Sequence, residues 1–304
     1  MNPLPVVSIG VPLYNAENFV EQALDSLIGQ TWTDLEIIIS DNASTDRTEE
    51  ICRRYAASDQ RIRYYRNDVN VGAGRNYNRV FELSRGKFFK WAAHDDVCAP
   101  EFVERCLKVL EERPDVVLAF PRMVDIDEKG TPIEGKPISD MPRGERGSSP
   151  VAHTRFRYLV RLGYTCEEVF GVIRSDVLRK TRLIQSYTDS DRTLLAELSL
   201  HGRLEEIPEQ LFYHRVHKGM STQAFTDWQS RTAWFDPTKA GKVVFPLWRQ
   251  YREYLAAIVR SPAALKDKLY CFLYMANWLR RHNGHLRIEI QKGFQLMMHR
   301  GALS

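Results

Sequence analysis

Runs of strand length alternate with helical stretches over the first 92 residues, and this alternation limits the possible folds more than any other feature. The strand-length runs are residues 6–12, 35–40, 62–66 and 87–92. Between them, apolar side chains recur at helical spacing in residues 19–28, 48–57 and 76–83. Alternation of this kind with short connections favours right-handed crossovers. The sequence therefore predicts an α/β fold with a mostly parallel central sheet flanked by helices.

The rest of the chain is less regular. Further strands are predicted at residues 116–120, 170–173 and 207–215, and helices near Asp176 and at residues 194–198. Residues 125–150 are rich in proline, glycine and charge, which is typical of a loop or an insertion. After Asp236 the sequence predicts a helical tail. We therefore divide the chain into two halves of one domain, residues 1–125 and 126–222, and a helical C-terminal extension, residues 223–304.

The composition excludes several classes of protein. The 43 Lys and Arg residues against 39 Asp and Glu give a net charge of +4, which suits an anionic small substrate or an anionic membrane surface but is too weak to indicate nucleic acid. Five cysteines without a C-x-x-C pair argue against disulfides and zinc, and favour a reducing cytoplasm. Residues 6–11 are too short for a signal sequence, and no run reaches the roughly 18 apolar residues of a membrane span.

Polar residues follow each predicted strand of the first half. They are Tyr14 and Asn15, then Asp41 and Asn42, then Arg75, and finally Asp95 and Asp96. Because ligands of open α/β sheets bind beyond the carboxyl ends of the strands, we expect these residues to share one site. Two adjacent carboxylates there could hold a divalent cation whose remaining ligands are phosphate oxygens. The alternative is that Asp95 and Asp96 only cap the helix that follows Pro100.

Four motifs in a fixed order carry a resemblance to a known family. They are Val-Pro-Leu-Tyr-Asn at 11–15, Glu-Ile-Ile-Ile-Ser-Asp-Asn-Ala-Ser-Thr-Asp at 36–46, Asn-Val-Gly with Arg-Asn within 70–76, and His-Asp-Asp at 94–96. Together they resemble the family 2 glycosyltransferases, which have the GT-A fold. The resemblance covers residues 5–125 strongly and 165–222 more loosely, and does not cover the tail.

The resemblance implies transfer of a sugar from a nucleotide-diphosphate donor, with a UDP-sugar favoured, to a saccharide or lipid-linked hydroxyl acceptor, usually with inversion. By similarity, Pro12 and Tyr14 line the base pocket and Asp41 accepts a hydrogen bond from the base. Arg75 contacts the base or its phosphates. Asp95 faces the ribose or the metal, and Asp96 ligates Mg²⁺ or Mn²⁺. Family habit suggests a role in cell-surface polysaccharide or glycolipid assembly.

The acidic motif departs from the family pattern. The family often has Asp-x-Asp-Asp, and here Ala93 stands in place of the first Asp. This leaves the division of roles between Asp95 and Asp96 open. His217 resembles the late histidine that many GT-A enzymes use on the metal or diphosphate, and Lys218 would add charge beside it. The alternative for His217 is a surface histidine in a basic loop.

Inversion requires a general base for the acceptor hydroxyl. Asp191 matches the family's late acidic position, and Asp189 is the second candidate because a slip of two residues is within alignment error. Either could instead cap the helix at 194–198. The first half would then bind the nucleotide sugar, and residues 126–222 the acceptor.

The tail carries an apolar stripe flanked by basic residues. The stripe consists of Leu265, Leu269, Phe272, Leu273, Ala276 and Leu279. It predicts either a helix packed on the main domain or on a second copy in a homodimer, or a helix lying on anionic lipid at the inner face of the membrane. Trp228, Trp234 and Trp248 favour core or interface roles, with stacking on an acceptor sugar as the alternative.

Two other functions remain as alternatives. A nucleotidyltransferase would carry a glycine-rich basic loop after the first strand, where this chain has Pro12-Leu13-Tyr14-Asn15. A non-catalytic relative that binds a nucleotide sugar is consistent with the missing first Asp.

Overall fold

The computed structural model describes residues 4–133, 147–161, 166–224 and 227–301. Its centre is an eight-stranded sheet in the order β3-β2-β1-β4-β7-β6-β8-β5. Four strands pair in parallel at one side: β1 (Val7–Leu13), β2 (Leu35–Asp41), β3 (Ile62–Arg66) and β4 (Phe88–Trp91). The other side is mixed: β7 (Val172–Arg174) runs antiparallel to β4 and β6 (Val116–Ile126), and β8 (Arg203–Arg215) runs parallel to β6. The short β5 (Val97–Cys98) pairs with the end of β8.

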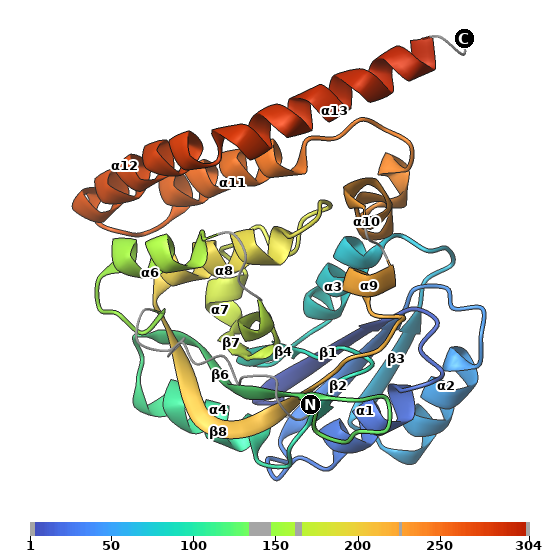
Figure 1. Ribbon diagram of the computed structural model, residues 1–304. Coiled ribbons are helices and arrows are strands. Elements are labelled where there is room, and N and C mark those ends of the chain that lie inside the picture. The colour runs from blue at the N-terminus through green and yellow to red at the C-terminus, as the bar shows by residue number, and fades with distance from the viewer. Residues whose placement is uncertain (1–3, 134–146, 162–165, 225–226, 302–304) are drawn as a thin grey trace.

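Helices cover both faces of this sheet (Figure 1), which confirms the predicted fold class. One face packs against α1 (Val20–Ile28), α2 (Thr48–Ser58) and α4 (Phe102–Glu112). The other packs against α3 (Ala73–Glu82), α6 (Ala152–Leu159), α7 (Ser175–Leu178) and α8 (Ser190–His201), with the turn η1 (Glu167–Phe170) beside them. Every residue of β1 and β2 is buried, because both faces of these strands are covered.

Close packing of α3 on β1 depends on Gly10. A Cβ atom at this position would lie 2.6 Å from Val80 Cγ2 and 2.8 Å from the ring of Phe89, closer than carbon atoms approach in proteins. The absence of a side chain therefore lets α3 lie directly against the strand. The helix begins three residues earlier than the predicted 76–83, so Arg75 lies in its first turn and not in a loop.

Two other sequence boundaries were wrong. Strand β6 extends to Ile126, beyond the predicted 116–120 and into the predicted loop. Strand β8 begins at Arg203, four residues before the predicted start, because a bulge accommodates Pro208. Pro121 pairs with Ile207 and Arg122 with Gln210, which leaves Pro208 and Glu209 outside the ladder. Most of the predicted insertion, residues 134–146, lies outside the described residues.

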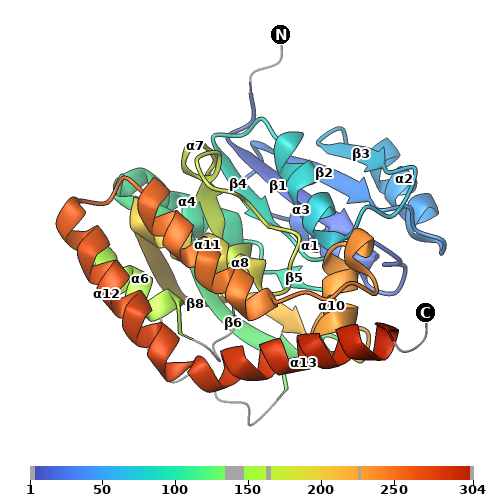
Figure 2. The same ribbon diagram turned by 90° about the horizontal axis from the view of Figure 1, so that it is seen from above.

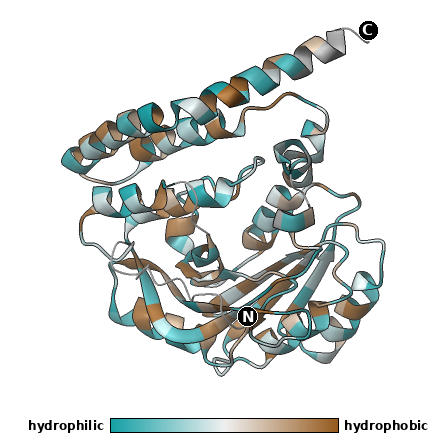
Figure 3. Cartoon of the chain, in the orientation of Figure 1, coloured by the Kyte–Doolittle hydropathy of each residue, from teal (hydrophilic) through white to brown (hydrophobic). Residues whose placement is uncertain are grey.

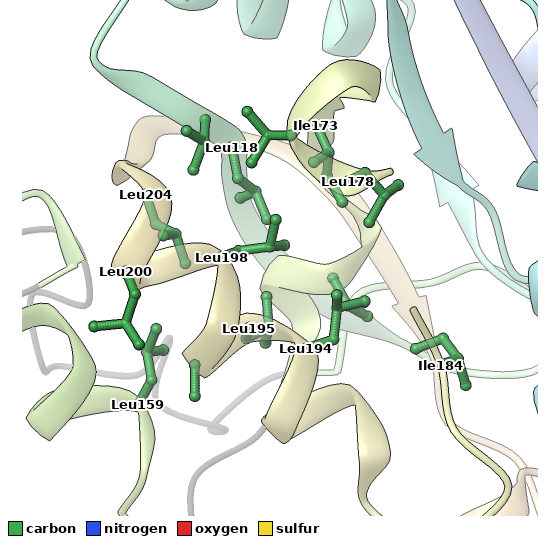
Figure 4. Close-up of a cluster of buried hydrophobic side chains, with 14 of the residues drawn as sticks. Leu118, Leu159, Ile173, Leu178, Ile184, Leu194, Leu195, Leu198, Leu200 and Leu204 are labelled. Carbon is green, nitrogen blue, oxygen red and sulfur yellow. The ribbon is translucent and has the colours of Figure 1, made fainter. Parts of the chain in front are cut away.

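A leucine-rich cluster fixes α8 against the sheet. Figure 4 shows Leu194, Leu195 and Leu198 of α8 gathered with side chains of β6 and β7, among them Leu118 and Ile173. These residues are at most 1% exposed, so the position of α8 is determined by tight apolar packing. The N-terminal turn of α8 is thereby held in a defined place.

The C-terminal extension forms a further helical layer (Figures 1 and 2). It comprises α9 (Ser221–Ala224), α10 (Trp228–Phe235), the turn η2 (Pro237–Lys239), α11 (Pro246–Arg260), α12 (Leu265–Arg281) and α13 (Asn283–Gly301). Tyr254 and Ile258 of α11 are fully buried in the core shared with α8. Trp278 of α12 donates from Nε1 to the carbonyl of Val160 at 2.9 Å. The extension is therefore anchored to the main domain.

Helix α12 packs through a different face from the apolar stripe in the sequence. Its buried residues are Cys271, Met275 and Trp278, whereas Leu265 is 73% and Leu273 68% exposed. Of the stripe, Leu269, Phe272 and Ala276 are also exposed. Figure 3 shows this mixture of apolar and polar residues along α12 and α13. Among the described residues, no helix is long and apolar enough to cross a bilayer.

Candidate active site

The carboxyl ends of β1, β2 and β4 lie side by side. Leu13 pairs with Asp41 across β1 and β2, and Gly10 pairs with Trp91 across β1 and β4. The polar segments that follow these strands therefore leave the sheet at one edge, as the sequence predicted for an open parallel sheet. The residues after β4 bring Asp95 and Asp96 to this edge.

The two acids point to different partners. The Oδ2 atom of Asp95 lies 2.9 Å from Nε2 of His217, which follows the end of β8. The Oδ1 atom of Asp96 accepts a hydrogen bond of 2.9 Å from the backbone N–H of Arg215, and the Asp96 side chain is only 6% exposed. Neither carboxylate caps α4, whose N-cap position is held by Glu101. The helix-cap alternative for Asp95 and Asp96 is therefore wrong.

Arg215 organises this acidic turn, and sequence reasoning missed it. Its side chain is 1% exposed and donates from Nε to the carbonyl of Asp95 at 2.8 Å. The same guanidinium donates to the carbonyls of Asp127 and Glu128 at 3.1 and 2.9 Å and to Oε1 of Gln22 at 2.7 Å. A buried arginine with this many acceptors fixes the backbone that carries the acids. The only signal in the sequence was its place between a strand and His217.

The environments of the acids move their pKa values apart. Burial raises the pKa of Asp95, but the charge of His94 and the hydrogen bond from His217 outweigh it and hold this pKa below its ordinary value. Burial and the neighbouring charge of Asp95 raise the pKa of Asp96. Asp95 is therefore the carboxylate that stays ionised, and it stands beside an imidazole.

Asp41 lies deep at the end of β2. It is fully buried, and its oxygens accept hydrogen bonds from the backbone N–H of Ser44 at 2.8 Å, the hydroxyl of Tyr64 at 2.8 Å and Arg66 at 2.6 Å. The predicted hydrogen bond from a base stays a prediction. In this structure the carboxylate fixes the turn after β2.

Asn42 belongs to a network of buried amides. Its Oδ1 accepts from Asn67 and from the backbone N–H of Val71, both at 2.9 Å, and its Nδ2 donates to Asn70 at 2.9 Å. Asn76 of α3 joins this network, accepting from the Ser40 hydroxyl at 2.7 Å. The network ties the loop before α3 to the end of β2. It therefore shapes the edge of the sheet at which a nucleotide would bind.

The remaining predicted donor-site residues differ in accessibility. Tyr14 is 41% exposed and Pro12 is buried within β1. Asn15 adopts a left-handed backbone conformation with φ of 50°, and its Oδ1 accepts from the backbone of Thr45 at 2.9 Å. Arg75 is exposed on α3 and Lys218 is exposed after β8. Tyr14, Arg75 and Lys218 are thus available to a ligand, and Asn15 joins the loops after β1 and β2.

Asp191 lies in the first turn of α8, and Asp189 stands just before it. The half-buried Asp191 has a pKa raised to about 6 by burial and by the charge of Asp189. Asp189 occupies the N-cap position with φ of 61°, yet its side chain makes no capping hydrogen bond and instead pairs with Arg231 at 3.5 Å. The simple capping role is therefore wrong for Asp189. A carboxylate with a pKa near 6 is suited to accept a proton.

The hydroxyl of Tyr77 on α3 is affected by both acidic segments. Burial raises its pKa, and the charges of Asp95, Asp96 and Asp191 raise it further. These charges come from segments almost 100 residues apart in the sequence. Sequence reasoning missed Tyr77, because it fell within the predicted helix 76–83 and carried no motif of its own.

The acid–imidazole pair fits a cation held mainly by a ligand. Asp95 and His217 supply two donors that already touch, and two protein ligands suffice for Mg²⁺ or Mn²⁺ when phosphates and water complete the shell. In the part of the chain that the structure describes, no cluster of three or more His, Cys, Asp or Glu side chains could hold a metal. Asp95 and His217 could therefore contribute to an open cation site whose other positions are filled by a ligand and water.

Comparison with known proteins identifies a family. The family model described as "Glycosyl transferase family 2" matches residues 8–178, which is more than half of the chain. An uncharacterized glycosyltransferase from Haemophilus influenzae is 27% identical over 237 residues, which cover 77% of this chain and 72% of that protein. In two other curated relatives, from Methanocaldococcus jannaschii and Rickettsia felis, the aligned region covers only 44% and 23% of the protein.

Solved structures share the fold. TarS 1-349 of S. aureus in complex with UDP-GlcNAc has a TM-score of 0.64 and 17% identity, with 91% of this chain and 72% of that chain covered. The mannosyltransferase PcManGT from Pyrobaculum calidifontis in complex with GDP-Man and Mn²⁺ has a TM-score of 0.56 and 16% identity, with 98% and 81% covered. At these identities the likeness shows a common architecture.

Proposed function

The chain belongs to glycosyl transferase family 2, and we propose that it is an inverting enzyme that moves a sugar from a nucleotide-diphosphate donor to a hydroxyl acceptor. A UDP-sugar is the favoured donor. The observation that carries this proposal is the contact of Asp95 with His217 beyond the strand ends, together with a second carboxylate, Asp191, in the first turn of α8. One carboxylate belongs to the diphosphate side of the site and the other to the acceptor side. Residues 1–125 would bind the donor and residues 126–222 would contribute the acceptor side.

For the metal, we propose a revision of the roles given to the two acids. Asp95 and His217 would hold Mg²⁺ or Mn²⁺, because they face one another, while Asp96 is committed to the backbone of Arg215. The solved PcManGT complex contains Mn²⁺, which supports a divalent ion in this fold. When bound, the ion would neutralise charge on the leaving diphosphate. Lys218 would add a positive charge near the same phosphates.

The donor would lie along the edge formed by the ends of β1 and β2. Tyr14 offers an exposed ring for the base, and Arg75 offers an exposed guanidinium. TarS was solved with UDP-GlcNAc, which supports a uridine nucleotide in this position. Pro12, Asn15, Asp41 and Asn42 would shape the pocket through the turns that they hold.

Asp191 would accept the proton of the acceptor hydroxyl while that oxygen attacks the anomeric carbon and the nucleoside diphosphate leaves. Its pKa near 6 leaves it mostly ionised at neutral pH, which a base requires. The rigid packing of α8 holds it in place, and an effective base must be well positioned. Attack from the side opposite the diphosphate gives inversion.

We further propose that the exposed row of α12 rests on an anionic lipid surface in the cytoplasm. Leu265, Leu269 and Leu273 are more than half exposed on one side of this helix. Lys266 and Lys268 lie at its beginning and Arg280 and Arg281 at its end, so the apolar row is flanked by positive charge. This combination favours a lipid surface over a second copy of a basic chain. A location there suits a lipid-linked acceptor and an assembly role in surface polysaccharide or glycolipid.

A panel of nucleotide sugars tests the proposal. Thermal shift with UDP-, GDP- and TDP-sugars, with Mn²⁺ or with EDTA, should show stabilisation by one nucleotide class that EDTA weakens. Hydrolysis of the same donor, measured as released nucleoside diphosphate, should require the metal. Binding without turnover of any donor would indicate a non-catalytic nucleotide-sugar binder. Release of pyrophosphate from a nucleoside triphosphate and a sugar phosphate would instead indicate a nucleotidyltransferase.

A further inference from the structure

A second cavity lies beside the segment that carries Asp191, outside the donor edge. It has a volume of about 590 Å³, which is within the range of small-ligand sites. Its walls come from α11, from the loop before it and from Ser186 and Tyr187, with Thr232 of α10 at one side. None of the residues assigned to the donor or the metal lines it.

The cavity is basic. Lys239, Arg249 and Arg252 line it, and its lining contains no Asp or Glu. Among the described residues neither Lys239 nor Arg249 has an ion-pair partner, and the buried Nε of Arg249 has no hydrogen-bond partner. The Arg249 guanidinium lies over the ring of Tyr187, 5.1 Å from its centroid. A buried donor without an acceptor is costly, so this site favours an anionic ligand.

Three acids on or beside the elements that line the cavity are already engaged. Glu253 pairs with Arg182 at 3.0 Å and, more distantly, with Arg252 at 3.5 Å. Asp236 accepts from Thr238 at 2.6 Å, and Glu289 accepts the backbone N–H groups of Leu247 and Trp248 at the start of α11. They therefore do not neutralise Lys239 or Arg249.

Aromatic rings form the rest of the walls. Tyr187, Phe245, Trp248 and Tyr251 line the cavity, and Trp248 stands at 88° to Tyr251 with centroids 6.4 Å apart. Flat rings with polar edges can cover the apolar face of a sugar and still leave its hydroxyl groups free to hydrogen-bond. Aromatic walls together with unpaired cations match a sugar that carries a negative group.

Hydrogen bonds join this cavity to residues on either side of the candidate base. The hydroxyl of Tyr187 donates to Thr193 of α8 at 2.8 Å, and Gln250 of α11 donates to the carbonyl of Asp189 at 3.3 Å. A ligand seated between α11 and Tyr187 would therefore lie beside the segment that carries Asp191.

We propose that this cavity binds the acceptor through an anionic group, so that the acceptor is a saccharide bearing a carboxylate or a phosphate. This inference rests on the proposed function for calling the ligand the acceptor, whereas the anion-binding cavity stands without it. Lys239 and Arg249 hold the negative group, Tyr187 and Trp248 cover the ring, and the reacting hydroxyl points towards Asp191.

Binding of three small probes to the full chain tests this inference. The probes are methyl glucuronoside, which carries a carboxylate, glucose 6-phosphate, and the neutral methyl glucoside. We expect at least one anionic probe to bind about tenfold more tightly than the neutral one in calorimetry or ligand-observed NMR. Which anionic probe binds better distinguishes a uronic acid from a sugar phosphate. The preference should weaken as salt is added.

Variants locate the site. Lys239→Gln and Arg249→Gln should each remove most of this preference, whereas Lys242→Gln, the same change at an exposed position outside the cavity, should leave it intact. If Arg249→Gln fails to fold, Lys239→Gln decides, because it lies in a surface turn. Equal affinities for charged and neutral probes, no binding of any probe, or a preference that survives both variants would overturn the inference.

The outcome can be separated from that of the proposed function. Metal-dependent donor hydrolysis without a charge preference at this cavity would refute only the inference about the acceptor. A charge preference that depends on Lys239, in a protein that turns over no nucleotide sugar, would refute the enzyme and leave an anion-binding cavity in place.

Discussion

Replacing Asp189 by Asn distinguishes the two candidate bases. The charge of Asp189 is one cause of the raised pKa of Asp191, and the charge of Arg231 acts in the opposite direction. If Asp191 is the base, activity rises with pH as this carboxyl loses its proton. With a pKa of about 6, kcat/KM should grow about tenfold between pH 5 and pH 7, because the ionised fraction does.

The variants should move this profile in opposite directions. Asp189→Asn removes a neighbouring negative charge, so the rise should occur at lower pH with nearly the same plateau. Arg231→Gln removes a positive charge that stabilises the ionised form of Asp191, so the rise should occur at higher pH.

Asp191→Asn should lower the plateau by about 10²-fold or more. The same variant should unfold at a higher temperature at pH 7, because it removes a buried charge whose pKa is raised in the folded state.

The assay is release of nucleoside diphosphate in the presence of acceptor and Mn²⁺, followed from pH 5 to pH 8. Melting curves at each pH show that the variants remain folded. If Asp189→Asn abolishes turnover while Asp191→Asn leaves the plateau unchanged, Asp189 is the base and our assignment is wrong. An unmoved profile in both charge variants would refute the electrostatic argument.

Three further experiments test other parts of the protein. Asp95→Asn should abolish the stimulation by Mn²⁺, and it should also lower Tm at neutral pH because the ionised Asp95 is stabilised in the folded state. Asp96→Asn should retain measurable metal affinity; the reverse result in metal titrations would restore Asp96 as the ligand. Arg215→Met should lower the free energy of unfolding by about 4 kcal/mol in urea titrations, about 1 kcal/mol for each of four lost side-chain hydrogen bonds, and a loss below about 1 kcal/mol would contradict its organising role. Leu273→Glu should weaken binding to anionic vesicles in flotation assays, whereas the equally exposed Leu4→Glu should not, and unchanged binding of both would exclude α12 as the contact.

The first half of the fold could be predicted because its elements are defined by local patterns. The strand at residues 62–66 was predicted to the residue, and the strands at 6–12, 35–40 and 87–92 to within one position at each end. Apolar runs that are buried on both faces leave few other possibilities. The acids after β4 were located for the same reason, since a strand that ends at a known residue fixes the start of the next segment.

Side-chain partners were not predictable from these patterns. Asp96 and Arg215 are 119 positions apart, and no periodicity links them. Asp41 carried a family motif, but its burial follows from the approach of Tyr64 and Arg66 on the neighbouring strand. Such contacts depend on how distant segments pack, which a single sequence does not encode in any local signal.

The face of α12 illustrates a different limit. Two rows of this helix are apolar at helical spacing, one containing Leu269 and Leu273 and the other Cys271, Met275 and Trp278. The hydrophobic pattern of the sequence indicated the row with more leucines as the apolar stripe of the helix. The protein buries the other row, because the indole of Trp278 finds both a ring partner in Tyr251 and an acceptor in the carbonyl of Val160.

The arrangement of the site implies that neither half of the chain can form it alone. The acidic turn after β4 depends on Arg215 for its backbone acceptors and on His217 for the partner of Asp95. Asp191 depends on a helix whose core partners lie in β6 and β7. A fragment of residues 1–125 would therefore keep the motifs of the donor side but lose the residues that orient them. The return of β8 to β5, just after β4, is what brings Arg215 and His217 to the acidic turn.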